Sequence, residues 1–241
     1  MWRIKSRLLR GNLLTVPDCN YLDALRALPR HLVVMDVDST LITAEVIELL
    51  ANAAGSGELV ADITDRAMRG ELDFAASLRE RVATLKGLPQ SVFAEVSAQV
   101  ELSQGAERYF ADLAELGWPV ALVSGGFEEI VGPLAQSLGI EHFAANCLEL
   151  AEDQLTGKTI GPVNDRAAKA EKLQQFAAEL GIDLAHTIAV GDGANDCDMV
   201  QTAAIGVAFN AKPALREVAN ISVDGGLDHV LPAVATLKAR V

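Results

Sequence analysis

The sequence has few cysteines, a deficit of basic residues and no long apolar run, and each shortage excludes a class of protein. Three scattered cysteines among 241 residues, with no CxxC pair, argue against a disulfide framework and a cysteine zinc site. No apolar stretch reaches the length that a membrane-spanning helix needs. We therefore expect a protein of the reducing cytoplasm with no membrane partner.

The shortage of basic residues limits the kinds of partner that the protein can bind. Lys and Arg number 20 against 33 Asp and Glu, a formal net charge of −13. A surface of that sign repels phosphodiester backbones, so no nucleic-acid partner is expected. An anionic substrate would need a local cation, either a metal ion or Lys/Arg. The first 17 residues are basic but lack the apolar region of a secretory signal, so we expect that they are not a targeting segment.

Half of the residues are hydrophobic, which is ample for a packed core. Short apolar runs alternate with longer helix-like stretches, a pattern that predicts an α/β fold with a doubly wound, Rossmann-like parallel sheet. The expected strands are 31–35, 119–123 and 187–190, and the expected helices are 106–116, 128–138, 165–180 and 194–203.

One segment breaks the alternation. Residues 43–104 contain helix-like stretches at 45–53, 58–68, 74–85 and 91–100, with no convincing strand. We predict an inserted helical cap domain here, above a core formed by 31–42 and 105–241, with 1–30 as an N-terminal extension. A second excursion, 148–163, is typical of a hairpin.

Carboxylates follow two of the predicted strands. Asp36 and Asp38 lie in DVDST (36–40), and Asp192 and Asp196 lie in GDGAND (191–196). Ligands of doubly wound sheets bind beyond the carboxyl ends of the strands, so these side chains should meet there. Clustered carboxylates are costly without a cation, and Mg²⁺ prefers oxygen ligands.

Three other motifs fail at a required position. GDGAND nearly matches GxGxxG, but its last residue is Asp196, whose charge would repel a pyrophosphate. LTGKT (155–159) ends like a phosphate-binding loop, but its first glycine would fall at Glu152. Leu122 replaces a glycine that a serine-hydrolase turn at Ser124 requires. Ser124 is instead a neutral donor beside the acidic cluster, with Lys169 or Lys172 as the cation of a phosphate site.

DVDST, Ser124, Lys169 and GDGAND together resemble, in order and spacing, the four motifs of the haloacid dehalogenase superfamily of phosphatases. Within it, the cap is similar to that of the phosphoserine phosphatases at Glu45, at MRGELDF (68–74) and at SLRERV (77–82). The resemblance covers roughly residue 32 to the C-terminus. It implies magnesium-dependent hydrolysis of O-phospho-L-serine, the last step of serine biosynthesis.

The resemblance also implies residue roles. Asp36 would be the nucleophile that forms an aspartyl phosphate, and Asp38 the general acid and base. Mg²⁺ would bind the side chains of Asp36 and Asp192 and the backbone carbonyl of Asp38, with Asp196 in support. The substrate would contact Ser124, Gly125 and Lys169 at its phosphate, Glu45 at its ammonium, Arg81 at its carboxylate, the apolar Met68 and Phe74, and Asn195.

Other functions remain open at this point. One is a broader small-molecule phosphatase, or a phosphotransferase that moves phosphate from phosphoserine to homoserine. Another is a non-catalytic phospholigand-binding protein, although such a protein would need neither a nucleophile nor an acid. We expect a monomer or homodimer.

Overall fold

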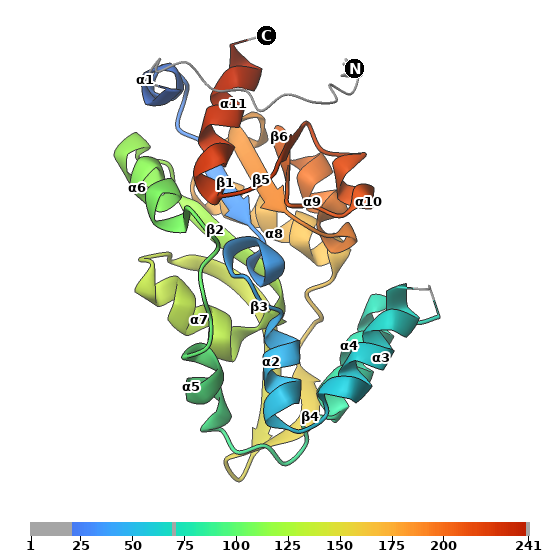
Figure 1. Ribbon diagram of the computed structural model, residues 1–241. Helices are drawn as coiled ribbons and strands as arrows, with labels where there is room; N and C mark the ends of the chain where they lie inside the picture. Colours follow the sequence, from blue (N-terminus) through green and yellow to red (C-terminus); the bar gives the residue numbers. More distant parts are fainter. Residues whose placement is uncertain (1–20, 69–70, 240–241) are drawn as a thin grey trace.

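The structure, a computed structural model, describes residues 21–68 and 71–239 (Figure 1). The predicted α/β fold is confirmed. One sheet has the order β4-β3-β2-β1-β5-β6-β7, and its neighbouring strands are parallel except for β4, which is antiparallel to β3. The strands are β1 (Leu32–Met35), β2 (Val120–Phe127), β3 (His142–Ala151), β4 (Gln154–Ile160), β5 (Thr187–Gly191), β6 (Ile205–Phe209) and β7 (Ile221–Val223).

Helices cover both faces of the sheet. Side chains alternate along β1, so Val33 and Met35 join one apolar cluster while Leu32 and Val34 join the other. The first cluster includes residues of α1 (Tyr21–Arg26), α6 (Ala106–Leu116), α7 (Glu128–Ser137) and α11 (Val230–Lys238). The second includes α8 (Arg166–Glu179), α9 (Cys197–Thr202) and α10 (Pro213–Arg216). The sheet is therefore doubly wound.

The register of the central strands places their ends side by side. β1 lies between β2 and β5, and Met35 is aligned with Leu122 on one side and with Val190 on the other. The residues that follow these three positions therefore meet at one edge of the sheet.

In the described chain, four α-helices lie between β1 and α6, as the sequence predicts. They are α2 (Val46–Ala53), α3 (Gly57–Met68), α4 (Phe74–Ala83) and α5 (Val92–Ser97), in the lower half of Figure 1. The two ends of this segment are joined, because Thr43 N donates to Glu101 O at 3.0 Å and Ser103 N donates to Leu41 O at 2.9 Å. We call residues 41–43 and 101–103 the neck.

The predicted hairpin is confirmed as β3 and β4, although β3 begins earlier, at His142. Its tip reaches the helical segment, since Gly87 N donates to Leu155 O and Leu155 N donates to Leu88 O, both at 2.8 Å. The division into a cap of 43–104 and a core that includes the hairpin therefore stays a prediction, and these bonds tie the two parts together.

The proposed extension, 1–30, lies largely outside the described residues, as does Cys19. Its described end forms α1, whose Leu25 is fully buried in the first apolar cluster. Across 21–68 and 71–239, no helix has the length and apolar character needed to cross a membrane.

Candidate active site

The two aspartates of DVDST leave β1 in different directions. Asp36 directly follows the strand, is 2% exposed, and accepts a hydrogen bond from Val37 N at Oδ1. The chain then turns through Ser39, whose φ of 55° lies in the left-handed region. Asp38 accepts from Val46 N at Oδ1 and from Ser124 Oγ at Oδ2, both at 2.7 Å. Asp38 thus joins the start of α2 to the end of β2.

The loop after β5 is built around Asp196. Its Oδ2 accepts from the backbone N–H groups of Asp192 and Gly193, both at 3.1 Å. A Cβ added at Gly191 would lie 2.5 Å from Asp196, so glycine is required for this close approach. These bonds fix the direction of Asp192, which also accepts a long 3.5 Å hydrogen bond from Thr40 Oγ1.

Lys169, from the first turns of α8, is fully buried between two carboxylates. Its Nζ lies 2.7 Å from Asp36 Oδ1 and 2.8 Å from Asp196 Oδ1. Burial alone would lower the pKa of Lys169, but Asp196 and Asp36 outweigh that effect and raise the pKa above its usual value. The side chain is therefore a fixed cation next to Asp36.

One lysine does not neutralise the cluster. Asp36, Asp192 and Asp196 are buried and each offers an oxygen within 4.8 Å of the others. Burial, followed by the charge of Asp196, raises the pKa of Asp192 to about 6 and raises the pKa of Asp36 well above its usual range. Three close, buried carboxylates form a donor set that a divalent cation would satisfy, so the described residues fit a metal site.

Asp38 has a distinct electrostatic environment. Burial and the nearby charge of Glu45 raise its pKa to about 6, against the lowering effect of the Val46 and Ser124 hydrogen bonds. A carboxyl group whose pKa lies close to neutrality suits proton transfer in both directions. Ser39 Oγ donates to Glu45 Oε1 at 2.7 Å, which anchors Glu45 above this turn.

Backbone lies close to these side chains at the end of β2. Ser124 Oγ accepts from Gly126 N at 2.7 Å, and a Cβ added at Gly126 would lie 2.7 Å from Asp38 Oδ2. Asn164 Nδ2 donates to Ser124 O at 2.6 Å and holds the strand end in place. Glycine here allows the Asp38 and Ser124 side chains to lie against the β2 backbone.

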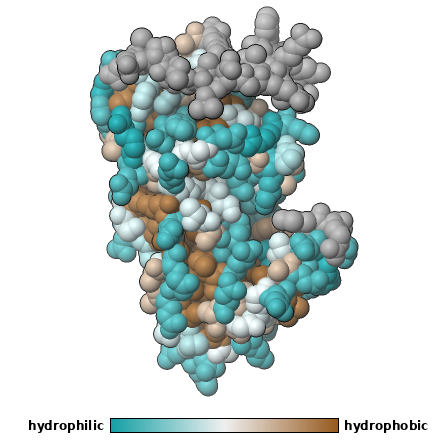
Figure 2. Space-filling view, viewed as in Figure 1, coloured by the Kyte–Doolittle hydropathy of each residue, from teal (hydrophilic) through white to brown (hydrophobic). Residues whose placement is uncertain are grey.

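A cavity of about 560 Å³ connects the strand ends with the helical segment. In Figure 2 it corresponds to the hollow beside the arm formed by α3 and α4. The predicted site residues that line it are Asp36, Asp38, Glu45, Phe74, Arg81, Gly125, Asp192 and Asn195. Three further predicted residues, Ser124, Lys169 and Asp196, are fully buried and do not line it. Ser124 is bonded to Asp38, and Lys169 is paired with both Asp36 and Asp196. Met68 ends α3, and its side chain lies outside what the structure describes, as do Arg69 and Gly70.

The cavity has opposite charges on its cap side. Arg81 on α4 is largely buried and, in the described chain, forms no ion pair within 4 Å; its Nε donates to Ser77 O at 3.3 Å. Burial lowers the pKa of Arg81, and the charge of Glu45 works against that shift. Phe74 packs over the strand end, since a Cβ added at Gly125 would lie 3.2 Å from its ring.

Among the cavity-lining residues that sequence reasoning did not assign to the site are Ser77, Arg166 and Lys212. Lys212 follows β6, a strand that we did not predict, and its N–H donates to Asp192 O at 2.9 Å. Arg166 lies one helical turn before Lys169 on α8, so the two side chains share a helix face, and this spacing could have predicted that Arg166 lies near the site.

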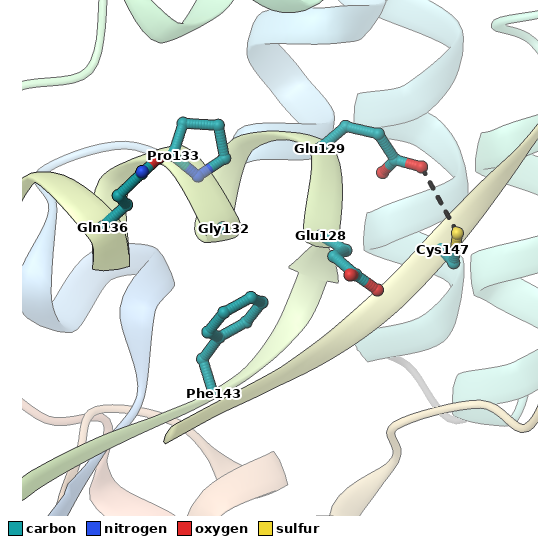
Figure 3. Close-up of a pocket in the computed structure, with 7 residues that line it drawn as sticks. All are labelled: Glu128, Glu129, Gly132, Pro133, Gln136, Phe143 and Cys147. Carbon is teal, nitrogen blue, oxygen red and sulfur yellow. Dashed lines mark hydrogen bonds between the residues drawn. The ribbon is translucent and has the colours of Figure 1, made fainter. Parts of the chain in front are cut away.

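A second cavity, of about 540 Å³, lies between α7 and β3 (Figure 3). Glu129 points toward Cys147, whose Sγ donates to Glu129 Oε1 at 3.6 Å, and the same oxygen accepts from Leu148 N. Burial and the charge of Glu129 raise the pKa of the Cys147 thiol, so it stays protonated and does not suit nucleophilic catalysis.

Comparison with known proteins connects this geometry to a family. Residues 33–201 match the haloacid dehalogenase-like hydrolases. The chain is 53% identical to a phosphoserine phosphatase of Mycobacterium tuberculosis over 88% of its own length, but it spans only 52% of that relative. It is 54% identical to a phosphoserine phosphatase of Streptococcus thermophilus, over 78% of this chain and 87% of the relative.

A solved structure agrees with the fold as well. It is described as a phospho-aspartyl intermediate analogue of phosphoserine phosphatase, and it superimposes with a TM-score of 0.80 at 40% identity. The match covers 85% of this chain and 99% of that one. The two chains therefore share both the sheet and the helical segment above it.

Proposed function

Since the chain belongs to the haloacid dehalogenase-like hydrolases, we propose that it hydrolyses O-phospho-L-serine to L-serine and phosphate. One observation carries the proposal. A single cavity is lined by two strand-end aspartates together with an acidic side chain, Glu45, and a basic side chain, Arg81. A phosphate ester that carries both an ammonium and a carboxylate group matches that arrangement.

The proposed first step is attack on phosphorus by the Asp36 carboxylate. Both protein contacts of Asp36 within the described chain use Oδ1, which leaves Oδ2 for the new bond. The bond from phosphorus to the serine oxygen breaks, and that oxygen takes the proton of Asp38. The products of this step are serine and an aspartyl phosphate on Asp36.

The second step reverses the role of Asp38. Its carboxylate takes a proton from water as the water oxygen attacks phosphorus, and the Asp36 carboxylate leaves with its electron pair. Phosphate is released, and Asp38 again holds a proton. The hydrogen bonds from Val46 N and Ser124 Oγ keep the Asp38 carboxyl in place through both steps.

Positive charge is needed around the phosphate oxygens. We assign phosphate binding to Ser124, Gly125, Lys169 and Asn195. Mg²⁺ would be held by the side chains of Asp36 and Asp192 and the backbone carbonyl of Asp38, with Asp196 in support because its oxygens already bind Lys169 and two N–H groups. When bound, the ion neutralises charge that develops on the phosphoryl oxygens.

The rest of the substrate would contact the helical segment. Arg81 would bind the carboxylate, because its planar fork matches that group, and Glu45 would bind the ammonium. Phe74 and Met68 would form an apolar cover that excludes water. We further propose a cytoplasmic location, supported by Cys147 and Cys197 being free thiols, and a monomer or homodimer.

The test is phosphate release from a panel of small phosphate esters, with Mg²⁺ and with excess EDTA. We expect the highest kcat/KM for phosphoserine, loss of turnover in EDTA and no acceleration by homoserine. Full activity in EDTA would contradict the metal assignment. Faster release from an unrelated ester would favour a broader phosphatase, and transfer to homoserine would favour a phosphotransferase.

A further inference from the structure

The side chains of α4 form a graded stripe along the cavity. Phe74, Ser77, Leu78 and Arg81 all line it, and their spacing of three, four and seven residues places them on one face of the helix. The stripe thus runs from an aromatic ring through a hydroxyl to a guanidinium. Phe74 and Arg81 have roles in the proposed function, whereas Ser77 has none so far.

The hydroxyl of Ser77 is the unusual member of this stripe. Ser77 is only 2% exposed, and its Oγ is buried without a hydrogen-bond partner among residues 21–68 and 71–239. Hydroxyls on helices commonly bond to a carbonyl of the preceding turn, and two others nearby do so: Thr64 Oγ1 donates to Val60 O at 2.9 Å and Thr84 Oγ1 donates to Arg81 O at 2.7 Å. A buried hydroxyl left unbonded is costly, which points to a partner that the protein itself does not supply.

The neighbours of Ser77 indicate the chemistry of that partner. Arg81 folds back along the helix, and its Nε donates to the backbone carbonyl of Ser77 at 3.3 Å, so the guanidinium lies next to Ser77 on the same helix face. A cation at this position disfavours an ammonium group and favours an anion. A carboxylate accepts several hydrogen bonds at once and can take one from each of these donors.

We propose that Ser77 is a specificity-determining residue whose hydroxyl donates a hydrogen bond to the substrate carboxylate bound by Arg81. This inference rests on the proposed function, because it requires a substrate that carries a carboxylate. The carboxylate takes no part in the transfer of the phosphoryl group, so the effect of Ser77 would fall on the choice of ester.

The experiment compares phosphoserine with O-phosphoethanolamine, which keeps the ammonium and the phosphate but lacks the carboxylate. Ser77→Ala should lower kcat/KM for phosphoserine about tenfold or more, the usual effect of losing a hydrogen bond to a charged group. It should leave O-phosphoethanolamine unchanged, and most of the loss should appear in KM. Ser77→Cys keeps nearly the same shape with a much weaker donor and should show the same selective loss.

Thr64→Val is the matched control, because Thr64 lines the same cavity but its hydroxyl is already bonded to Val60 O. Its ratio of the two kcat/KM values should equal that of the wild type. Equal losses on both esters, or recovery of the wild-type ratio in Ser77→Cys, would overturn the inference and assign Ser77 to packing. Wild-type enzyme that shows no preference for phosphoserine would instead overturn the proposed function.

Discussion

Asp36 and Asp38 stand two residues apart, yet they contact different partners. Asp36 is paired with Lys169, whereas Asp38 is held by a serine hydroxyl and a backbone N–H and faces Glu45. Burial and Asp196 raise the pKa of Asp36, whereas Lys169 lowers it, and a bound cation would lower it further and favour the carboxylate that attacks. Within the described residues Asp38 has no lysine in hydrogen-bond contact, and burial and Glu45 bring its pKa to about 6, which suits a group that gives up and takes back a proton.

These two environments predict different outcomes for the same substitution. Asp36→Asn should abolish turnover of phosphoserine, since no nucleophile remains. Asp38→Asn should lower kcat by about 10² to 10⁴, the usual contribution of general acid catalysis. Both variants should be assayed for phosphate release and for acid-stable phosphoenzyme by mass spectrometry after an acid quench.

Phosphoenzyme should be undetectable in Asp36→Asn. Its appearance there would show that another residue is attacked and would reverse the assignment. A loss in Asp38→Asn as complete as that in Asp36→Asn would mean that Asp38 does more than move a proton.

At the scale of elements, α4 and the strand ends line one cavity, and the proposed function assigns substrate recognition to α4 and the reaction to the strand ends. We predict that Arg81→Ala lowers kcat/KM for phosphoserine roughly 10²- to 10³-fold, because truncating one partner of a buried charge pair costs about 2 to 5 kcal/mol. Hydrolysis of p-nitrophenyl phosphate, which has no carboxylate, should change little. The measurement is steady-state kinetics on both esters with one preparation.

Arg79→Ala is the matched control, since Arg79 is exposed on the same helix. It should leave both substrates unaffected, with circular dichroism confirming the fold of each variant. If Arg81→Ala lowered the two esters equally, Arg81 would serve the folding or position of α4 rather than recognition.

The elements that the sequence predicts best are those with a simple local signal. β1 and β5 are apolar runs that end next to an acid, and α6 has the bounds that its pattern indicates, Ala106–Leu116. β6 and β7 went unpredicted because β6 includes a glycine and β7 has three residues, too few for a clear pattern. β2 continues past the expected end at 123 to Phe127.

The site residues also differ in whether the local sequence could predict them. Asp36, Ser124 and Asp192 could be placed together because their strands pair side by side. Ser77 and Lys212 could not, since nothing local distinguishes one serine on a helix or one lysine in a loop. Their roles depend on which elements meet across the cavity, and that is set by tertiary packing.

At the scale of the whole molecule, the buried acidic cluster couples metal binding to stability. The pKa of Asp192 is raised to about 6, so the stability that this residue contributes is present at low pH and is lost as pH rises through that value. At pH 7.5 the metal-free protein therefore carries an unfavourable charge. A bound cation would remove that repulsion.

We predict that Mg²⁺ at about 100 times its Kd stabilises the protein by about 2.7 kcal/mol, a rise in Tm of roughly 5 to 10 °C. Asp192→Asn should show a much smaller rise, and without metal it should melt above the wild type at pH 7.5. Differential scanning calorimetry of both proteins, with Mg²⁺ and with EDTA, measures these values. An unchanged wild-type Tm on adding Mg²⁺ would contradict the metal site.

The neck has a consequence for how such a chain can diversify. Its backbone hydrogen bonds hold Thr43 beside Glu101, so the long intervening segment leaves and rejoins the sheet at one point, as a short surface loop would. The entropic cost of closing a loop grows only slowly with its length. Insertions, deletions or exchange within this segment can therefore alter which molecules are accepted, while Asp36 and Lys169, which lie outside it, keep their places.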